Sequence, residues 1–257
     1  MSDDPIRQAI GDGQTVFVSW HTLGVALALE MAGRAGWRAA LIDQQHGFGG
    51  QAELLAGLTA ARAGGLAAIV RVAGNDTGLI GRALDAGAQG VMCPMINTGD
   101  EARRFVDAVK YPPLGRRSWG PYRAALMIDG GDDIARANGW TLACAQIETR
   151  QAIDNLEAIL ATDGLDAILV GPNDLAVSMT GARDISATDV LEAVATVRER
   201  AVAAGVITWI FANDAAYARR MIADGWQMVS IGSDGGWLAA GTAAPLAEIR
   251  DFPLSDQ

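Results

Sequence analysis

Short apolar runs recur along the chain, and a glycine precedes most of them by a few residues. Runs of this length without an alternating polar position are typical of strands buried on both faces of a sheet. A glycine just before such a strand suits the left-handed residue that ends many helices. The predicted strands are residues 15–19, 39–42, 67–70, 91–93, 141–145, 167–170, 206–210 and 228–231.

The stretches between these strands show the period of amphipathic helices. Residues 54–62 and 190–201 place leucine, valine and alanine on one face, and Thr188 is a suitable start for the second of these helices. Strands that alternate with helices predict parallel pairing, so we expect a (β/α)8 TIM barrel formed by residues 1–257 as one domain. The alternative is a doubly wound open sheet, which would carry a glycine-rich phosphate turn after its first strand. Residues 20–24 do not form such a turn.

Polar and ionisable residues collect where the predicted strands end. In a barrel of this kind the carboxyl ends of the strands form one rim, and catalytic residues come from that rim. Both histidines of the chain are among them. The residues at the strand ends are Trp20, His21, Asp43, His46, Arg71, Gln146, Glu148, Gly171, Pro172, Asn173, Asp174, Phe211 and Ser233.

Two acids stand just beyond neighbouring strands. Glu148 follows the fifth strand and Asp174 follows the sixth. A carboxylate at the end of a buried strand is costly unless it is paired, and two of them suggest a shared divalent cation bound through oxygen atoms. Either acid alone could instead cap the following helix. The presence of both favours a metal site.

Other rim residues are candidates for proton transfer and substrate binding. His46, beside an acidic turn, is a candidate base, and Arg71 directly follows a buried strand, so its charge must face a substrate oxygen, Glu148 or a structural partner. Gln146 is a candidate hydrogen-bonding residue. Trp20 and Phe211 either pack in the core or form walls of the pocket.

Composition excludes several classes of function. Lysine and arginine total 20 against 30 acids, a net charge of -10, which disfavours a nucleic-acid surface. No apolar run has the length of a membrane span, and the acidic N-terminus does not resemble a signal peptide. We expect Cys93 and Cys144 to be reduced core residues of a cytoplasmic protein. The single lysine, Lys110, is not at a strand end, which argues against a Schiff-base aldolase.

The segment 111–123 interrupts the alternation of strands and helices. It is rich in proline, arginine and aromatic residues. A loop of this length in a compact domain is usually functional or disordered, and this composition favours an ordered loop that binds an anion or a neighbouring subunit.

Taken together, these motifs resemble those of one known family over residues 10–245. The motifs are Trp20, the run 41–47, Arg71, the run 84–90, Pro112, Pro113, Gly115 and Arg117, Gln146 and Glu148, and Gly171, Pro172, Asp174 and Leu175. The chain is similar in these positions to the HpcH/HpaI aldolases, the class II pyruvate aldolases.

This resemblance implies a (β/α)8 barrel whose last helix is exchanged between subunits, assembled as a hexamer of three dimers. It also implies a Mg, Mn or Co ion and enolate chemistry on a small 2-oxo acid, pyruvate or hydroxypyruvate, which adds to an aldehyde. No organic cofactor, nucleic acid or membrane is expected. One position departs from the family: Gln45 stands where a glutamate is usual, which removes a charge next to His46.

The residues then suggest a division of labour. Glu148 and Asp174 hold the cation, Arg71 stabilises the enolate, and His46 moves the proton through an intervening water, with Asp43 or Asp85 as orienting residue. Asp85 could reach the site from a neighbouring subunit. Its position late in a helix is, however, more typical of a residue that only faces solvent. The backbone around Asn173, after Gly171 and Pro172, could hold the substrate carboxylate. Alternatives are a metal-dependent carbon–carbon lyase acting on a CoA thioester, and a non-catalytic barrel that binds a small acid.

Overall fold

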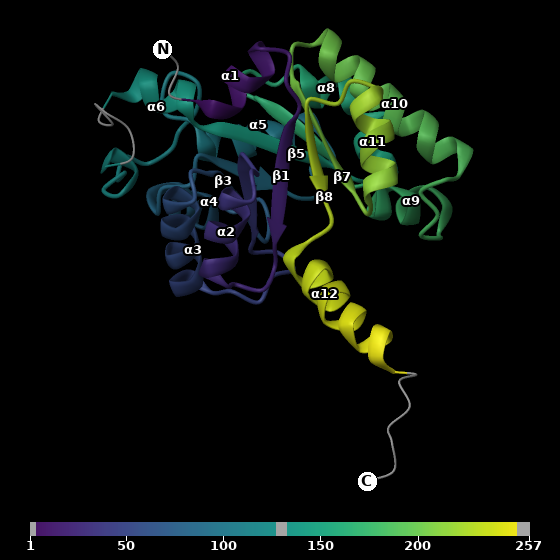
Figure 1. The fold of residues 1–257 in the computed structure, drawn as a ribbon. Coiled ribbons are helices and arrows are strands. Elements are labelled where there is room, and N and C mark those ends of the chain that lie inside the picture. The colour runs from purple at the N-terminus through teal and green to yellow at the C-terminus, as the bar shows by residue number, and fades with distance from the viewer. Residues whose placement is uncertain (1–3, 127–132, 251–257) are drawn as a thin grey trace, which may run out of the picture.

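The computed structural model describes residues 4–126 and 133–250, and in these residues eight parallel strands close into a barrel (Figure 1). The strands are β1 (Val16–His21), β2 (Ala39–Asp43), β3 (Ala67–Arg71), β4 (Gly90–Cys93), β5 (Leu142–Ile147), β6 (Ala167–Val170), β7 (Ile207–Ala212) and β8 (Met228–Ile231). Each strand pairs with its neighbour in sequence, and Val18 of β1 lies opposite Ser230 of β8. That last pairing closes the sheet, so the predicted barrel is confirmed and the open sheet is excluded.

Several strands, β1 among them, extend further toward the rim than the apolar runs predicted. β5 continues through Gln146, and β7 continues through Phe211. Gln146 is tolerated inside a buried strand because its amide nitrogen donates a hydrogen bond to Glu148. Both side chains therefore face the barrel mouth from within strands rather than from loops.

Helices cover the outside of the barrel, and two of them lie where the sequence pattern indicated. The helix after β2 and the helix before β7 were both predicted, the second with its start at Thr188. The helices are α1 (Pro5–Gly11), α2 (Ala26–Arg34), α3 (Gln51–Ala63), α4 (Thr77–Asp85), α5 (Gly99–Val109), α6 (Ile134–Trp140), α7 (Arg150–Asp154), α8 (Leu156–Leu160), α9 (Pro172–Thr180), α10 (Thr188–Ala203), α11 (Ala215–Ala223) and α12 (Asp234–Ile249), with a short 3-10 turn at Ala124–Leu126.

The hydrophobic core has two layers. Inward side chains such as Val18, Leu41 and Trp209 fill the barrel, and a larger cluster packs between the strands and the helices. Cys93 and Cys144 are buried free thiols, as expected. In the described part of the chain, we find no helix with the length and apolar character needed to cross a membrane.

Buried charges close the barrel at the amino ends of the strands. Helix α1 contributes Arg7, which binds Asp166 just before β6. Lys110 also binds Asp166, at 2.7 Å, and its ammonium group donates to the carbonyl of Thr141. The single lysine is therefore held by hydrogen bonds and an ion pair at the end of the barrel opposite the rim. No lysine is available for imine chemistry at the rim.

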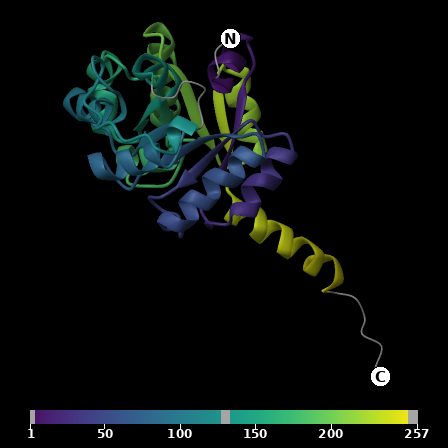
Figure 2. The ribbon, with the colours of Figure 1, turned by 90° about the vertical axis from the view of Figure 1, so that its left-hand side faces the viewer.

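Helix α12 does not fold back onto the barrel. It leaves the carboxyl end of β8 and projects away from the body of the molecule in both orthogonal views (Figures 1 and 2). Its apolar residues Leu238, Leu246 and Ile249 are 55–63% exposed. On the barrel, Phe17, Trp37 and Ile231 line a hollow of about 240 Å³ on the outer surface. The first turn of α12 packs on the barrel, with the ring centroids of Trp237 and Trp37 5.5 Å apart. The rest of the helix is exposed, so an exposed apolar helix and an exposed apolar hollow occur in the same chain.

Asp234 holds the start of α12 against the end of β1. Its carboxylate accepts hydrogen bonds from the backbone N–H and hydroxyl of Thr22 and from the N–H of Leu23, and it lies 3.6 Å from Nδ1 of His21. Burial alone would raise the pKa of Asp234, but His21 and the backbone donors outweigh it and lower the pKa to about 2. His21, which the sequence left open between packing and substrate contact, is a buried packing residue.

We predict that Asp234→Asn lowers the free energy of unfolding at pH 7 by about 1–2 kcal/mol, because a charged acceptor of several buried donors is lost. The folded-state pKa lies below the unfolded value, so the wild-type advantage is complete above about pH 5 and falls as the pH approaches about 2, with about half remaining at pH 3. Urea unfolding between pH 7 and pH 3 measures it, with exposed Asp189→Asn as control. A difference that does not change with pH would contradict this account.

Candidate active site

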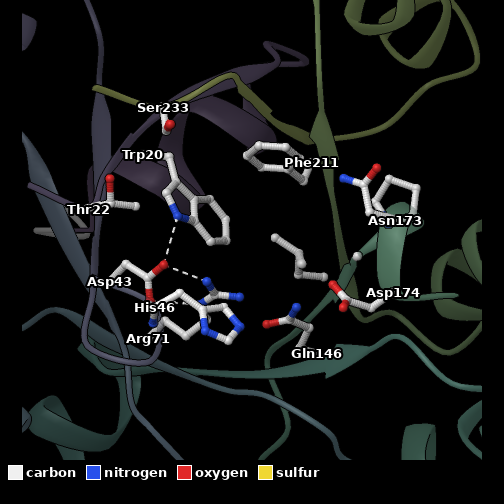
Figure 3. Close-up of a pocket in the computed structure, with 13 residues that line it drawn as sticks. Trp20, Thr22, Asp43, His46, Arg71, Gln146, Asn173, Asp174, Phe211 and Ser233 are labelled. Carbon is white, nitrogen blue, oxygen red and sulfur yellow. Dashed lines mark hydrogen bonds and ion pairs between the residues drawn. The ribbon is translucent and has the colours of Figure 1, made fainter. Parts of the chain in front are cut away.

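A pocket of about 230 Å³ opens at the carboxyl ends of the strands (Figure 3). Ten residues predicted from the sequence line it: Trp20, Asp43, His46, Arg71, Gln146, Gly171, Pro172, Asn173, Asp174 and Phe211. Asp43, Arg71 and His46 lie together on one side, and Phe211 and Asn173 lie on the opposite side (Figure 3). The convergence expected of a barrel rim is therefore observed.

Asp43 and Arg71 form a buried ion pair on this rim. Nε and Nη2 of Arg71 donate to the two carboxylate oxygens of Asp43 at 3.0 and 2.5 Å. The indole N–H of Trp20 donates to the same carboxylate at 3.2 Å. Burial raises the pKa of Asp43, but the hydrogen bonds and the charge of Arg71 outweigh it and lower the pKa. Asp43 therefore stays ionised.

The orientation of Arg71 leaves one nitrogen for a ligand. Asp43 occupies one edge of the guanidinium, and Nη1 has no hydrogen-bond partner among the described residues. The guanidinium carbon lies 4.8 Å from the centroid of the Trp20 ring. The sequence suggested a substrate oxygen, Glu148 or a structural ion pair as partner of Arg71, and in this structure the partner is Asp43. The pair fixes Arg71 while Nη1 remains a donor toward the pocket.

His46 lies in the loop after β2, and its side chain is exposed at the pocket wall. Asp43 accepts a hydrogen bond from the backbone N–H of His46 at 3.1 Å, rather than from the imidazole. No hydrogen bond joins the imidazole to Asp43 among the described residues, because the carboxylate is already bound by Arg71, Trp20 and backbone donors, and a role of Asp43 in orienting His46 stays a prediction. Asp43 instead fixes the backbone that carries His46.

Asp85 is not in the pocket of its own chain. It is the last residue of α4, a helix that runs back toward the amino ends of the strands, and it forms a 2.7 Å ion pair with Arg117. It therefore does not contact His46 within one chain. Arg117 also stacks over Tyr111, and Arg123 binds the carbonyl of Ala86. Residues 111–123 are thus held on α4 of the same chain, and whether they meet an anion or another subunit stays a prediction.

Glu148 is held in a buried position just beyond β5. The backbone N–H of Met95 donates to one carboxylate oxygen at 2.9 Å, and Nε2 of Gln146 donates to the other at 2.5 Å. Burial and the nearby charge of Asp174 raise the pKa of Glu148 to about 7, against the lowering effect of the Met95 N–H. The ionised form of a carboxylate in this position is unfavourable, and a nearby positive charge would stabilise it.

Neither acid caps a helix. Thr149 caps α7 through its side chain, and Asp174 is the third residue of α9, after the cap residue Gly171. Met95 reaches Glu148 by adopting φ = +56°, a left-handed conformation that is uncommon for a residue other than glycine. Gly171 is required by close approach, because a Cβ there would lie 3.0 Å from both Gln146 Nε2 and Glu148 Oε2.

These residues fit a hard divalent cation. Glu148 and Asp174 could supply oxygen ligands, and in the described residues no third histidine, cysteine or acid joins them to form a protein-only cage. Gln146 Oε1 is buried at the pocket and lacks a hydrogen-bond partner among these residues. Two carboxylates with open positions suit Mg²⁺ or Mn²⁺, which keep several water or substrate oxygens.

Three lining residues were not among the predicted site residues. Thr22 and Ser233 flank the rim at β1 and α12, and Leu169 projects into the pocket from within β6. Leu169 stands in a continuous apolar run, so nothing in the sequence separates it from core residues. Ser233 stood at a predicted strand end but was given no role. Its position after the eighth strand was the signal that it would lie at the pocket.

Comparison with known proteins agrees with this geometry. The family model described as HpcH/HpaI aldolase/citrate lyase matches residues 17–240. A hydroxypyruvate/pyruvate aldolase of Rhizorhabdus wittichii is 36% identical over 95% of this chain and 98% of its own length. A 5-keto-4-deoxy-D-glucarate aldolase of Shigella dysenteriae is 33% identical over 92% of this chain and 93% of its own.

Among solved structures, an HpcH/HpaI aldolase/citrate lyase family protein of Burkholderia cenocepacia superimposes with a TM-score of 0.89. It is 33% identical, and the match covers 96% of this chain and all of the other. The matches extend over the barrel and over every strand that contributes to the pocket. The chain belongs to the HpcH/HpaI aldolase/citrate lyase family.

Proposed function

We propose that this protein is a divalent-metal-dependent class II aldolase that joins a 2-oxo acid, pyruvate or hydroxypyruvate, to an aldehyde and catalyses the reverse cleavage. The observation that carries the proposal is one pocket lined by Asp174 and by the Arg71–Asp43 pair, with the buried carboxylate of Glu148 close enough to interact with the charges of Asp174 and Arg71. The relatives named as aldolases support the same reaction class. The single lysine is buried at the other end of the barrel, which argues against an imine route.

Glu148 and Asp174 are the residues that would hold Mg²⁺, Mn²⁺ or Co²⁺. When bound, such an ion supplies Lewis-acid polarisation of the 2-oxo acid carbonyl. Gln146 keeps Glu148 in place through Nε2 and directs Oε1 into the pocket. No organic cofactor is required by this scheme.

Arg71 would act on the same carbonyl oxygen. Its Nη1 can donate to this oxygen while Asp43 holds the rest of the guanidinium, so charge that develops in the enolate meets a fixed donor. The first turn of α9, after Gly171 and Pro172, presents the backbone N–H groups of Asn173 and Asp174, which suit the substrate carboxylate. The 2-oxo acid is then held at both ends.

His46 would be the residue that moves protons. Its exposed imidazole lies at the pocket wall on the same side as Arg71 (Figure 3). In the addition direction, a C3 proton of the 2-oxo acid is removed, C3 bonds to the aldehyde carbon, and the aldehyde oxygen takes up a proton. His46 would carry the proton between these positions through water. Asp85 of a neighbouring subunit remains a proposed orienting group.

The apolar surfaces of α12 support its exchange between two subunits. Leu238 and Leu246 are more than half exposed, while Phe17, Trp37 and Ile231 line a hollow on the outer surface of the barrel. Placing one subunit's α12 on another's barrel would bury both. Exchange of this kind favours a dimer as the building block of the predicted hexamer.

We predict that EDTA abolishes aldol cleavage and that Mg²⁺, Mn²⁺ or Co²⁺ restores it. Glu148→Gln should weaken cation binding by at least tenfold together with activity, because one of two protein ligands loses its charge. Isothermal titration with Mn²⁺ and an activity assay measure the two effects. Exposed Glu157→Gln is the matched control. Full turnover in EDTA would exclude a class II mechanism.

Arg71→Lys should lower kcat by about a hundredfold, because it keeps the charge but loses the planar set of donors. Exchange of pyruvate methyl protons with D2O, followed by NMR without aldehyde, should slow equally. Arg34→Lys on the surface serves as control. If the exchange rate of Arg71→Lys matched wild type, Arg71 would have no role in stabilising the enolate.

Gly171→Ala should weaken Mn²⁺ binding without a large loss of melting temperature. The new methyl group would press on Gln146 and Glu148, which must then move. Gly81→Ala in α4 is the matched control, since an added Cβ there meets nothing within 4 Å. Unchanged Mn²⁺ affinity in Gly171→Ala would show that the position of Glu148 does not set cation binding.

A further inference from the structure

The turn between β4 and α5 supplies a backbone group that holds Glu148. Among the residues that the structure describes, Met95 in this turn is the one residue other than glycine with a positive φ, +56°. Its N–H donates to Oε1 of Glu148 at 2.9 Å. A left-handed backbone disfavours a residue with a Cβ by roughly tenfold. Contacts outside Met95 must therefore stabilise this conformation.

The side chain of Asn97 makes hydrogen bonds on both sides of this contact. Its Nδ2 donates to the carbonyl oxygen of Met95 at 2.8 Å, and its Oδ1 accepts a hydrogen bond from the hydroxyl of Thr149. Thr149 directly follows Glu148, and its hydroxyl oxygen accepts from the N–H of Ala152 at 3.0 Å. The Asn97 amide is therefore fixed at both its nitrogen and its oxygen.

These hydrogen bonds close a ring that includes the Glu148 carboxylate. The ring runs from this carboxylate to the N–H of Met95, from the Met95 carbonyl to Asn97. It then passes through the Thr149 hydroxyl and returns along the chain to Glu148. A change of φ at Met95 would rotate its N–H relative to its carbonyl, so the bonds to Glu148 and Asn97 could not both be kept. The ring thus opposes relaxation of Met95.

The backbone of Asn97 is anchored independently of its side chain. Its N–H donates to Oε2 of Glu101 in the first turn of α5 at 2.7 Å, and its carbonyl accepts from Nδ2 of Asn155, between α7 and α8, at 3.0 Å. The neighbouring Ile96 is buried. Removing the side-chain amide of Asn97 would leave these anchors in place, so we expect a variant at this position to fold.

We propose that Asn97 is a positioning residue for cation binding: it keeps Met95 in the left-handed conformation, in which the Met95 N–H holds Glu148 in place for a divalent cation. The proposal rests on the cation site proposed above and adds a residue that is not among those lining the pocket. Loss of Asn97 would lower the population of the binding-competent backbone and raise the apparent dissociation constant accordingly. A saturating cation would restore that population.

The test measures Mn²⁺ binding to the metal-free protein by isothermal titration. Asn97→Ala should weaken Mn²⁺ binding by about five- to tenfold, the scale of losing one hydrogen bond. Asn75→Ala is the matched control, because Nδ2 of Asn75 also donates to a backbone carbonyl near the start of α5, but to that of Glu101 rather than Met95. The Mn²⁺ affinity of this control should equal that of wild type.

Exchange of pyruvate methyl protons with D2O gives a second measurement. The Mn²⁺ concentration for half-maximal exchange should rise in Asn97→Ala by the same factor as the dissociation constant. The exchange rate at saturating Mn²⁺ should stay within about twofold of wild type. If Asn97 only stabilised the fold, Asn97→Ala would lower the melting temperature and the saturated rate without shifting the Mn²⁺ dependence, and the proposal would be rejected.

Met95→Gly tests whether Asn97 acts through the left-handed backbone. Glycine adopts a positive φ without steric cost, so in this background Asn97→Ala should weaken Mn²⁺ binding by only about twofold. An equal loss in both backgrounds, or an unchanged Mn²⁺ affinity in Asn97→Ala alone, would overturn the role of Asn97 and leave the cation site standing. If wild type itself bound no Mn²⁺, the proposed cation site would be rejected, and the role of Asn97 with it.

Discussion

The buried carboxylate of Asp43 organises one side of the pocket. It receives the guanidinium of Arg71 from β3, the indole N–H of Trp20 from β1 and the backbone N–H groups of Gln45 and His46 from its own loop. One side chain thus connects three strands and the loop that carries the candidate base. Removing one partner of a buried ion pair typically lowers the free energy of unfolding by about 3–5 kcal/mol. Asp43 and Arg71 therefore depend on each other.

The other side of the pocket depends on close approach of backbone to carboxylate. Glu148 is held by the N–H of Met95, which requires a left-handed backbone, and by Gln146, while Gly171 leaves room for both. This geometry keeps a buried acid beside Asp174, an arrangement that a divalent cation would neutralise. The fixed charge of Arg71 lies near these two acids, and the cation proposed above would add a second positive charge to the same pocket.

Much of this could be predicted from the sequence because buried parallel strands have a simple pattern. Continuous apolar runs located the strands, and their ends located Asp43, Arg71 and Asp174 at the pocket and Glu148 close to Asp174 and Arg71. The partners of these residues could not be predicted. That Arg71 binds Asp43 instead of Glu148 depends on which rotamers the neighbouring strands allow, and the position of Asp85 depends on the direction of α4.

We expect Asp43 to act on the donor substrate through Arg71, and a double-mutant cycle tests this most directly. The rate of pyruvate methyl-proton exchange would be measured with Mn²⁺ for wild type, Asp43→Asn, Arg71→Lys and the double variant. The account predicts that the double variant is hardly slower than either single variant, because both changes remove the same oriented donor. Effects that multiply would show that Asp43 and Arg71 act independently and would contradict the account.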